Sequence, residues 1–142
     1  MSAAKTFVDS NIVLYLLSAD SAKADRAEAV VAGGALVSVQ VLNEVANVAR
    51  RKLGMSWEET NEVLSAIRSA CPVEALTIET HDCGRRVAQC YGFSVYDAMI
   101  VASALQAGCA TLCSEDMQDG LVVDGQLRIC NPFTARAPAD VP

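Results

Sequence analysis

The stretch Lys5-Thr6-Phe7-Val8-Asp9-Ser10-Asn11-Ile12-Val13-Leu14 decides the fold. Residues 5–8 predict a short β-strand, and residues 11–17 predict a helix. The polar pair Asp9-Ser10 marks the junction between them. The first predicted unit is therefore a strand that passes directly into a helix.

The same order recurs along the rest of the chain. Further helices are predicted at 22–32, 39–53, 79–91 and 95–107, together with one that runs from a capping-box pattern at Ser56 and Glu59 to about residue 70. Further strands are predicted at 35–38, 73–78, 109–113 and 127–130. Strands that alternate with helices indicate an α/β fold with a central, mainly parallel sheet of about four to five strands, covered on both faces. We expect one domain over residues 1–134 and a frayed tail over 135–142.

The composition limits the class of protein. A chain of 142 residues with 52% hydrophobic residues can bury a core without disulfides or structural metals. A formal net charge of −6 argues against a general nucleic-acid binder, although a nuclease whose acidic site first binds cations remains possible. The longest uncharged stretch, 98–114, contains Gln106 and Gly108, so it predicts a buried helix and strand and not a membrane span. We see no signal peptide and expect a cytoplasmic protein.

The six cysteines do not predict a zinc site. They form no CxxC pair, and His81 is the single histidine. Reduced, structural thiols are expected in the cytoplasm. The cysteines are Cys71, Cys83, Cys90, Cys109, Cys113 and Cys130.

Four acidic residues stand at the ends of apolar elements or inside them, where a carboxylate is costly unless it is paired, hydrogen-bonded or bound to a metal. They are Asp9, Glu44, Asp97 and Asp116. Ligands of open parallel sheets bind beyond the carboxyl ends of the strands. The predicted topology can bring all four acids to that edge, which suggests one shared cation.

Three of the four also have a purely structural explanation. Asp9 can cap the helix that follows it, since aspartate is a favoured N-cap. Asp97 fits a capping box with Ser94, and Asp116 fits a polar turn. The sequence leaves both explanations open for these three residues.

Glu44 has no such explanation. It lies about a turn and a half into the helix predicted at 39–53, too far along for a capping role. Arg50 and Arg51 are candidate partners, but they lie outside the i+3 and i+4 positions at which helical side chains meet. A partly buried glutamate at this position therefore predicts a cation.

Such an acidic group suits metal-assisted hydrolysis. Mg²⁺ and Mn²⁺ prefer oxygen ligands, and carboxylates from different parts of a chain can supply them. The bound ion polarises a phosphodiester, helps to deprotonate a water and stabilises the leaving oxygen. The chain offers no serine–histidine pair as an alternative, because its single histidine lies in a polar helix start.

Weaker signals concern RNA and protein contacts. Two short basic runs are candidate contacts to a phosphate backbone, or else solvated helix faces: Arg50, Arg51 and Lys52, and Arg85 and Arg86. Asp119 is either a further ligand or the turn before Gly120. Apolar side chains on the helices at 11–17 and 39–53 suit a dimer or a partner groove, or a plain core.

Four segments resemble the PIN-domain family, most closely the VapC toxins of bacterial toxin–antitoxin pairs. They are Phe7-Val8-Asp9-Ser10-Asn11, Leu42-Asn43-Glu44-Val45, Ser94-Val95-Tyr96-Asp97-Ala98-Met99-Ile100-Val101-Ala102 and Leu112-Cys113-Ser114-Glu115-Asp116-Met117-Gln118-Asp119-Gly120. Each segment alone is weak evidence. Together they span residues 7–120 in a family-like order.

The resemblance implies a three-layer α/β/α sandwich and a Mg²⁺- or Mn²⁺-dependent ribonuclease. It implies that Asp9, Glu44, Asp97 and Asp116 are the catalytic and metal-binding residues. By the same resemblance, Asn11 orients Asp9, and Ser114 supports Asp116 or a metal-bound water. It further implies a cognate antitoxin that inserts a segment into the active-site groove, and a homodimer. The acidic composition fits recognition of one structured RNA, such as tRNA or rRNA, by shape.

Two other functions remain open from the sequence. A non-catalytic PIN-like module would bind protein or RNA with the same fold, and its acids would be caps and turn residues. A phosphotransferase of the haloacid dehalogenase type also starts with an apolar strand that ends in aspartate. That chemistry needs a second aspartate two residues later, where this chain has Asn11, and a well-placed lysine.

Overall fold

A six-stranded sheet forms the centre of the protein, whose computed structural model describes residues 4–134. The strand order is β3-β2-β1-β4-β6-β5, and every neighbouring pair is parallel except β5 with β6. The strands are β1 (Thr6–Val8), β2 (Ala35–Ser38), β3 (Val73–Glu74), β4 (Thr111–Cys113), β5 (Val122–Val123) and β6 (Leu127–Cys130). The expected tail at 135–142 lies outside the described residues.

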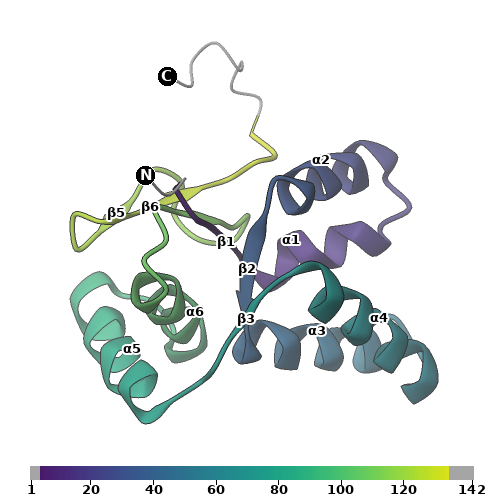
Figure 1. The fold of residues 1–142 in the computed structure, drawn as a ribbon, viewed down its shortest axis with the longest axis horizontal. Helices are drawn as coiled ribbons and strands as arrows, with labels where there is room; N and C mark the ends of the chain where they lie inside the picture. Colours follow the sequence, from purple (N-terminus) through teal and green to yellow (C-terminus); the bar gives the residue numbers. More distant parts are fainter. Residues whose placement is uncertain (1–3, 135–142) are drawn as a thin grey trace.

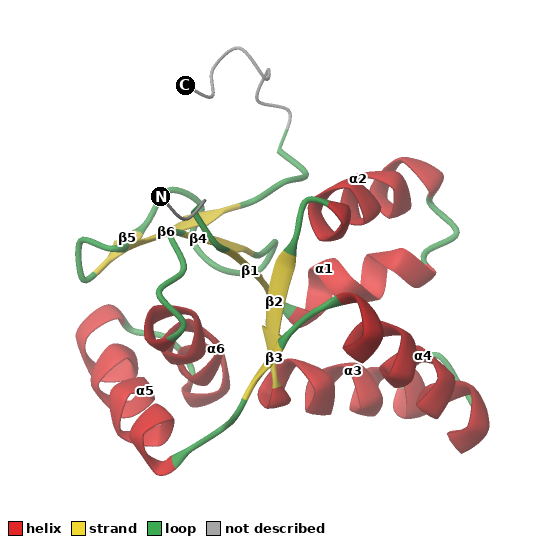
Figure 2. Cartoon of the chain, viewed as in Figure 1, coloured by secondary structure: helices red, strands yellow, loops and turns green. Residues whose placement is uncertain are grey.

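Helices enclose the sheet in a three-layer α/β/α arrangement (Figures 1 and 2). They are α1 (Ser10–Leu14) with the 3-10 turn η1 (Tyr15–Leu17), α2 (Ser21–Ala32), α3 (Val39–Arg51), α4 (Trp57–Ala70), α5 (Ile78–Tyr91) and α6 (Val95–Gln106). Helices α5 and α6 pack together on one side of the sheet, and α1 and α2 lie on the other. Helix α3 contacts both α1 and α6, so it links the two outer layers at the edge where the parallel strands end.

Local capping sets most of the helix boundaries. Helix α4 begins with the predicted capping box, in which Ser56 Oγ accepts from Glu59 N and Glu59 accepts from Ser56 N. Thr77 and Thr80 form a second box at the start of α5. That second box corrects the strand predicted at 73–78, because Thr77 already belongs to the helix start and β3 stops at Glu74.

The sheet has six strands, one more than the upper expectation of five. The missing strand was β5, which pairs antiparallel with β6 through a tight turn. Asp124 and Gly125 form this turn with positive φ values of 52° and 65°. A two-residue strand carries too little periodicity to be recognised in the sequence.

Helix α6 is the most deeply buried helix. Its residues from Ala98 to Ala104 are all buried, which explains its apolar sequence without a membrane. Helix α5 approaches it closely at Gly84, where a Cβ would lie 2.7 Å from Met99 Cε. In the described part of the chain, no helix is both long and apolar enough to cross a bilayer.

The cysteines behave as small core and surface residues. Cys71, Cys109 and Cys113 are buried, and none of the six cysteines forms a disulfide within residues 4–134. Burial raises the pKa of the Cys113 thiol to about 11. The buried Cys113 thiol is therefore a poor nucleophile at neutral pH.

Candidate active site

Asp9 lies at the carboxyl end of β1 and is the N-cap of α1. It is 2% exposed, and its carboxylate accepts hydrogen bonds from Ser10 N (2.7 Å), Ser114 Oγ (2.7 Å) and Asn11 Nδ2 (3.2 Å). Burial raises its pKa to about 6, and nearby Glu44 contributes to the rise although the hydrogen bonds oppose it. The capping role predicted for Asp9 is confirmed, and its carboxylate is at the same time buried near Glu44.

Glu44 faces Asp9 from α3 across the Ser10 hydroxyl. Ser10 Oγ donates to Glu44 Oε1 at 2.7 Å and lies 3.4 Å from Asp9 Oδ1. Gln40, one turn earlier on α3, donates to Glu44 Oε2 at 3.1 Å. Glu44 is thus oriented by neutral groups and not by an arginine of its own helix.

Asp116 joins this group through the amide of Asn11. Asn11 Nδ2 donates to both Asp9 Oδ2 (3.2 Å) and Asp116 Oδ2 (3.1 Å). On the other side of the amide, Asn11 Oδ1 accepts from Glu115 N at 3.2 Å. Asn11 therefore contacts the Asp9 carboxylate and also connects it to the loop that carries Asp116.

Ser114 stabilises the same loop through hydrogen bonds to its backbone. Its Oγ donates to Asp9 and accepts from Asp116 N (3.2 Å) and Met117 N (3.3 Å). Met117 is buried in the core. The predicted support of Asp116 by Ser114 is therefore made through the Asp116 backbone.

Asp97 completes the group from the first turn of α6. Ser94 caps this helix by accepting from Asp97 N at 3.2 Å. Burial raises the pKa of the Asp97 carboxyl, and Glu44 and Asp116 raise it further. Asp9 and Asp97 each titrate in the field of Glu44, so the four acids form one electrostatic unit.

The donor set fits a hard divalent cation, although it is not a preassembled cage. No three histidine, cysteine or acidic side chains among residues 4–134 lie close enough to form a metal site by themselves. The three ion pairs of this part of the chain involve none of the four acids. Oxygen ligands without a protein cation suit Mg²⁺ or Mn²⁺, which keep several waters and need few carboxylates.

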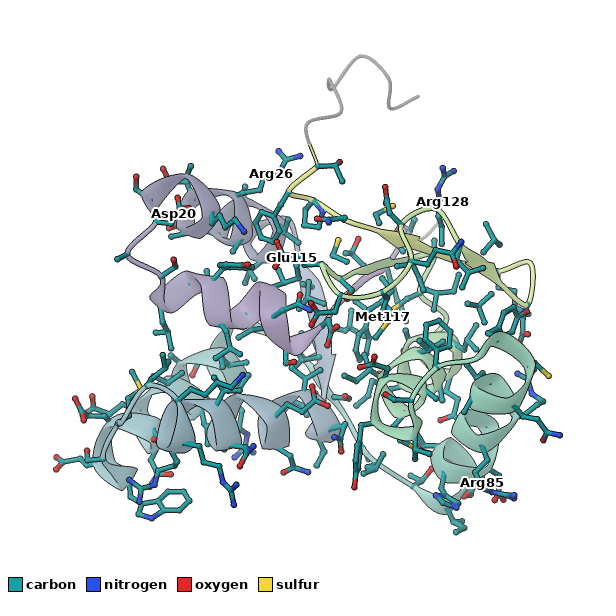
Figure 3. All side chains as sticks on the ribbon, turned by 180° about the vertical axis from the view of Figure 1, so that it is seen from behind. Asp20, Arg26, Arg85, Glu115, Met117 and Arg128 are labelled. Atoms are coloured by element: carbon teal, nitrogen blue, oxygen red, sulfur yellow. The ribbon has the colours of Figure 1, made fainter. Side chains whose placement is uncertain are left out.

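Ser10, Gln40 and Glu115 contribute to this arrangement although they were not expected from the sequence. Ser10 bridges Asp9 to Glu44, and its position between Asp9 and Asn11 was the available signal. Glu115 accepts from the Tyr15 hydroxyl and pairs with Lys23 at 3.1 Å, which ties the Asp116 loop to η1 and α2 (Figure 3). The Tyr15 hydrogen bond and Lys23 lower the pKa of Glu115.

The remaining predicted residues lie outside this group. Asp119 Oδ1 accepts from Asn131 N at 2.9 Å, so it connects the loop to the end of β6. Arg85 pairs with Asp82, and Arg86 pairs with Asp124 at 2.6 Å. Both arginines of α5 are therefore engaged.

The basic residues at the end of α3 are differently placed. Arg50 donates to Met55 O at 2.7 Å, and its guanidinium lies 4.7 Å from the centroid of the Trp57 ring. Arg51 and Lys52 are exposed and form no ion pair with the residues the structure describes.

Comparison with known proteins agrees with this architecture. The profile of the PIN domain matches residues 6–118. No curated protein sequence matches the chain.

Many solved structures share the fold, and three of them illustrate the similarity. A toxin–antitoxin complex from Klebsiella pneumoniae aligns with a TM-score of 0.69 at 18% identity, covering 92% of this chain and 98% of that one. VapBC-1 from nontypeable Haemophilus influenzae aligns with a TM-score of 0.65 at 15% identity, covering 91% and 98%. VapC20 from Mycobacterium tuberculosis, a toxin that cleaves the sarcin-ricin loop, aligns with a TM-score of 0.63 at 22% identity, covering 76% and 87%.

Proposed function

Because the chain belongs to the PIN-domain family, we propose that it is a Mg²⁺- or Mn²⁺-dependent endoribonuclease that acts as the toxin of a toxin–antitoxin pair. The observation that carries the proposal is the linkage of Asp9, Glu44 and Asp116 through Ser10 and Asn11, with Asp97 in the electrostatic field of Glu44 and Asp116. No lysine or arginine in residues 4–134 pairs with any of these four acids.

Each residue has a role in this proposal. Asp9, Asp97 and Asp116, with Glu44, hold the divalent cation, which when bound supplies Lewis-acid activation of the phosphodiester and of water. Asn11 and Ser114 keep the carboxylates oriented through the contacts given above. Ser10 and Gln40 restrain Glu44 by donating one hydrogen bond to each of its carboxylate oxygens, and each oxygen keeps capacity for a further contact.

The direct test is cleavage of structured RNA with Mg²⁺ or Mn²⁺ and with EDTA. Asp9→Asn and Asp97→Asn should each reduce kcat about a hundredfold or more, since each removes charge where the ion must bind. Asp25→Asn, a change at an exposed residue of α2, is the matched control for charge and for contaminating nucleases. If both site variants cleave like the parent, the assignment of the site is wrong.

The second candidate function is a non-catalytic PIN-like module that binds protein or RNA. The hydrogen-bonded capping of Asp9 and the turn at Asp116 are compatible with it. Calorimetric titration with Mn²⁺ separates the two proposals. A parent protein that binds no divalent ion at about millimolar concentrations favours the non-catalytic module.

An apolar groove supports the proposed antitoxin partner. It has a volume of about 540 Å³ and lies between α1–η1, α2 and α4. Val13, Leu17 and Val63 contribute apolar surface, and Glu59 and Glu62 stand at the same groove. An amphipathic segment with basic residues beside its apolar face fits this lining.

The partner proposal is tested with the product of the adjacent reading frame, which we expect to encode a short DNA-binding protein. Co-expression should yield a complex that Ala66→Arg weakens, because this residue lines the groove. Metal-dependent cleavage by the free variant should stay unchanged. We also propose a cytoplasmic homodimer, which sedimentation of the purified chain would test.

A further inference from the structure

Trp57 is an exposed aromatic side chain in a basic setting. It is the only tryptophan of the chain, opens α4 and is 59% exposed. The Arg50 guanidinium carbon lies 4.7 Å from the centroid of the Trp57 ring. Arg51 and Lys52 follow Arg50 directly in the sequence. An open hollow of about 450 Å³ between α3 and α4 is lined by Ala46, Asn47, Arg50, Arg51 and Trp57.

Core packing does not account for this arrangement. Arg50 fastens the connection between the helices through Met55 O, and that contact does not need the indole. Most of the Trp57 side chain remains in solvent, although burying an aromatic ring of this size stabilises a fold strongly. The ring is held in place by a cation on one side while its surface stays available to a ligand.

The hollow lies on the helical stripe that carries Glu44. Asn47 and Arg51 are three and seven residues after Glu44, so they follow it along one side of α3. Arg51 is two turns away, about 10 Å along the axis, because each residue rises about 1.5 Å. Stacked nucleotides advance about 3.4 Å each, so about three of them span this separation.

The charges nearby do not oppose a polyanion along this path. Glu59 accepts from Ser56 N, and both Glu59 and Glu62 line the apolar groove between α4 and α1–η1. Glu58 is the carboxylate next to Trp57 in the chain. Arg51 and Lys52, which form no ion pair within residues 4–134, outnumber it where α3 ends and α4 begins.

We infer that Trp57, Arg50 and Arg51 form a subsite for single-stranded RNA, in which one base stacks on the Trp57 ring and Arg51 contacts the adjacent phosphate. The subsite places the unpaired part of a substrate along α3, with the scissile bond toward Glu44. It rests on the proposed ribonuclease function and extends it, because it states that the substrate must be unpaired about three nucleotides from the cut.

Binding is measured without cleavage, in EDTA. Addition of a short uridine oligonucleotide should quench the fluorescence of Trp57, which reports on this position alone. Anisotropy of the same oligonucleotide carrying a dye should show binding about 5-fold or more weaker for Trp57→Leu, since stacking of one base contributes about 1–3 kcal/mol. Trp57→Phe should retain most of the affinity because it keeps an aromatic face.

Arg51→Gln should weaken binding and lower its salt dependence by about one phosphate contact. Arg128→Gln is the matched control: it removes the same charge from β6, far from α3 and α4 (Figure 3), and should leave affinity unchanged. In metal-dependent cleavage, Trp57→Leu should raise KM with little change in kcat.

Three results would overturn the inference. The first is an unquenched Trp57 at oligonucleotide concentrations that give binding. The second is equal oligonucleotide affinity of the parent and of Trp57→Leu, when circular dichroism shows that both proteins are folded. The third is a dimer that Trp57→Leu converts to monomer without change in RNA affinity, which would assign this surface to a second copy of the chain. Asp97→Asn separates the two proposals, because it should stop cleavage and leave quenching intact.

Discussion

Replacing Asp9 by asparagine should stabilise the metal-free protein at neutral and alkaline pH, and the gain should disappear in acid. Asp9 is 2% exposed, and burial, with Glu44 and Asp97 nearby, raises its pKa to about 6. Asparagine has nearly the same volume and no charge. The substitution therefore removes the cost of an ionised carboxylate that forms no ion pair within residues 4–134.

The sign and size follow from proton linkage. The folded pKa lies above the ordinary value of 3.8, so the native state gains stability from the protonated carboxyl below that value and loses it as pH rises through about 6. Each pH unit corresponds to about 1.4 kcal/mol, so the full cost is about 3 kcal/mol above pH 6 and less than about 1 kcal/mol near pH 4. In the variant, the new amide NH₂ group of residue 9 can face Asn11 Nδ2, which is also a donor. Loss of this hydrogen bond would reduce the stability gain by about 1 kcal/mol at every pH.

Urea unfolding in EDTA at about pH 4, 6 and 8 measures the effect, with Asp25→Asn as the control. The stability difference between Asp9→Asn and the parent should increase by about 2 kcal/mol from the lowest to the highest pH. A difference that does not change with pH would refute the reasoning, because only titration of Asp9 produces the trend. Added Mg²⁺ should then stabilise the parent and not the variant.

Three further predictions concern Glu44, Glu115 and the helix contact at Gly84. Glu44→Gln should abolish metal-dependent cleavage and leave the thermal unfolding midpoint equal or higher, because it relieves repulsion from Asp9 and Asp97; an unfolded variant would indicate a structural role. Glu115→Gln should weaken Mn²⁺ binding in calorimetry by loosening the Asp116 loop. The pKa of Glu115 is lower in the folded protein than its ordinary value of 4.5. The ionised side chain should therefore stabilise the fold at neutral pH, and this effect should be lost as the pH falls below 4.5. Urea denaturation of the parent and Glu115→Gln at neutral pH and below pH 4.5 checks this. Gly84→Ala should change the free energy of unfolding by less than about 1 kcal/mol, because the flexible end of Met99 can shift and alanine favours a helix interior, whereas Gly84→Val should destabilise the fold by about 1–3 kcal/mol; urea denaturation of both variants checks this.

Much of the secondary structure was predictable because its signals are local. The strands at Ala35–Ser38 and Leu127–Cys130 have the predicted bounds, and the capping box at Ser56 has the predicted partners. Helix ends depend on residues within one turn, so a short pattern contains the information. The prediction of a strand over residues 73–78 was wrong beyond Glu74, because Thr77 and Thr80 form the cap of α5.

The four acids of the proposed site could be selected from the sequence, but the hydrogen bonds that connect them could not. The four carboxylates stood out because apolar elements surround them in the chain. The contact from Ser114 to Asp9 joins residues 105 positions apart, and that from Asn11 to Asp116 also joins residues 105 apart. No local pattern specifies such pairs, and Ser10 and Glu115 were overlooked for this reason.

The sequence by itself determined the alternation of strands and helices, the identities of the four acids and the places where helices start. Only the tertiary structure decided that Asp9 is both a cap and a buried member of the acidic group, that Glu44 contacts Ser10 and not Arg50, and that Arg50 lies over Trp57. The physical reason is that capping is a contact between neighbours in the chain. Burial, charge pairing and proton affinity depend on which distant elements the sheet brings to one edge.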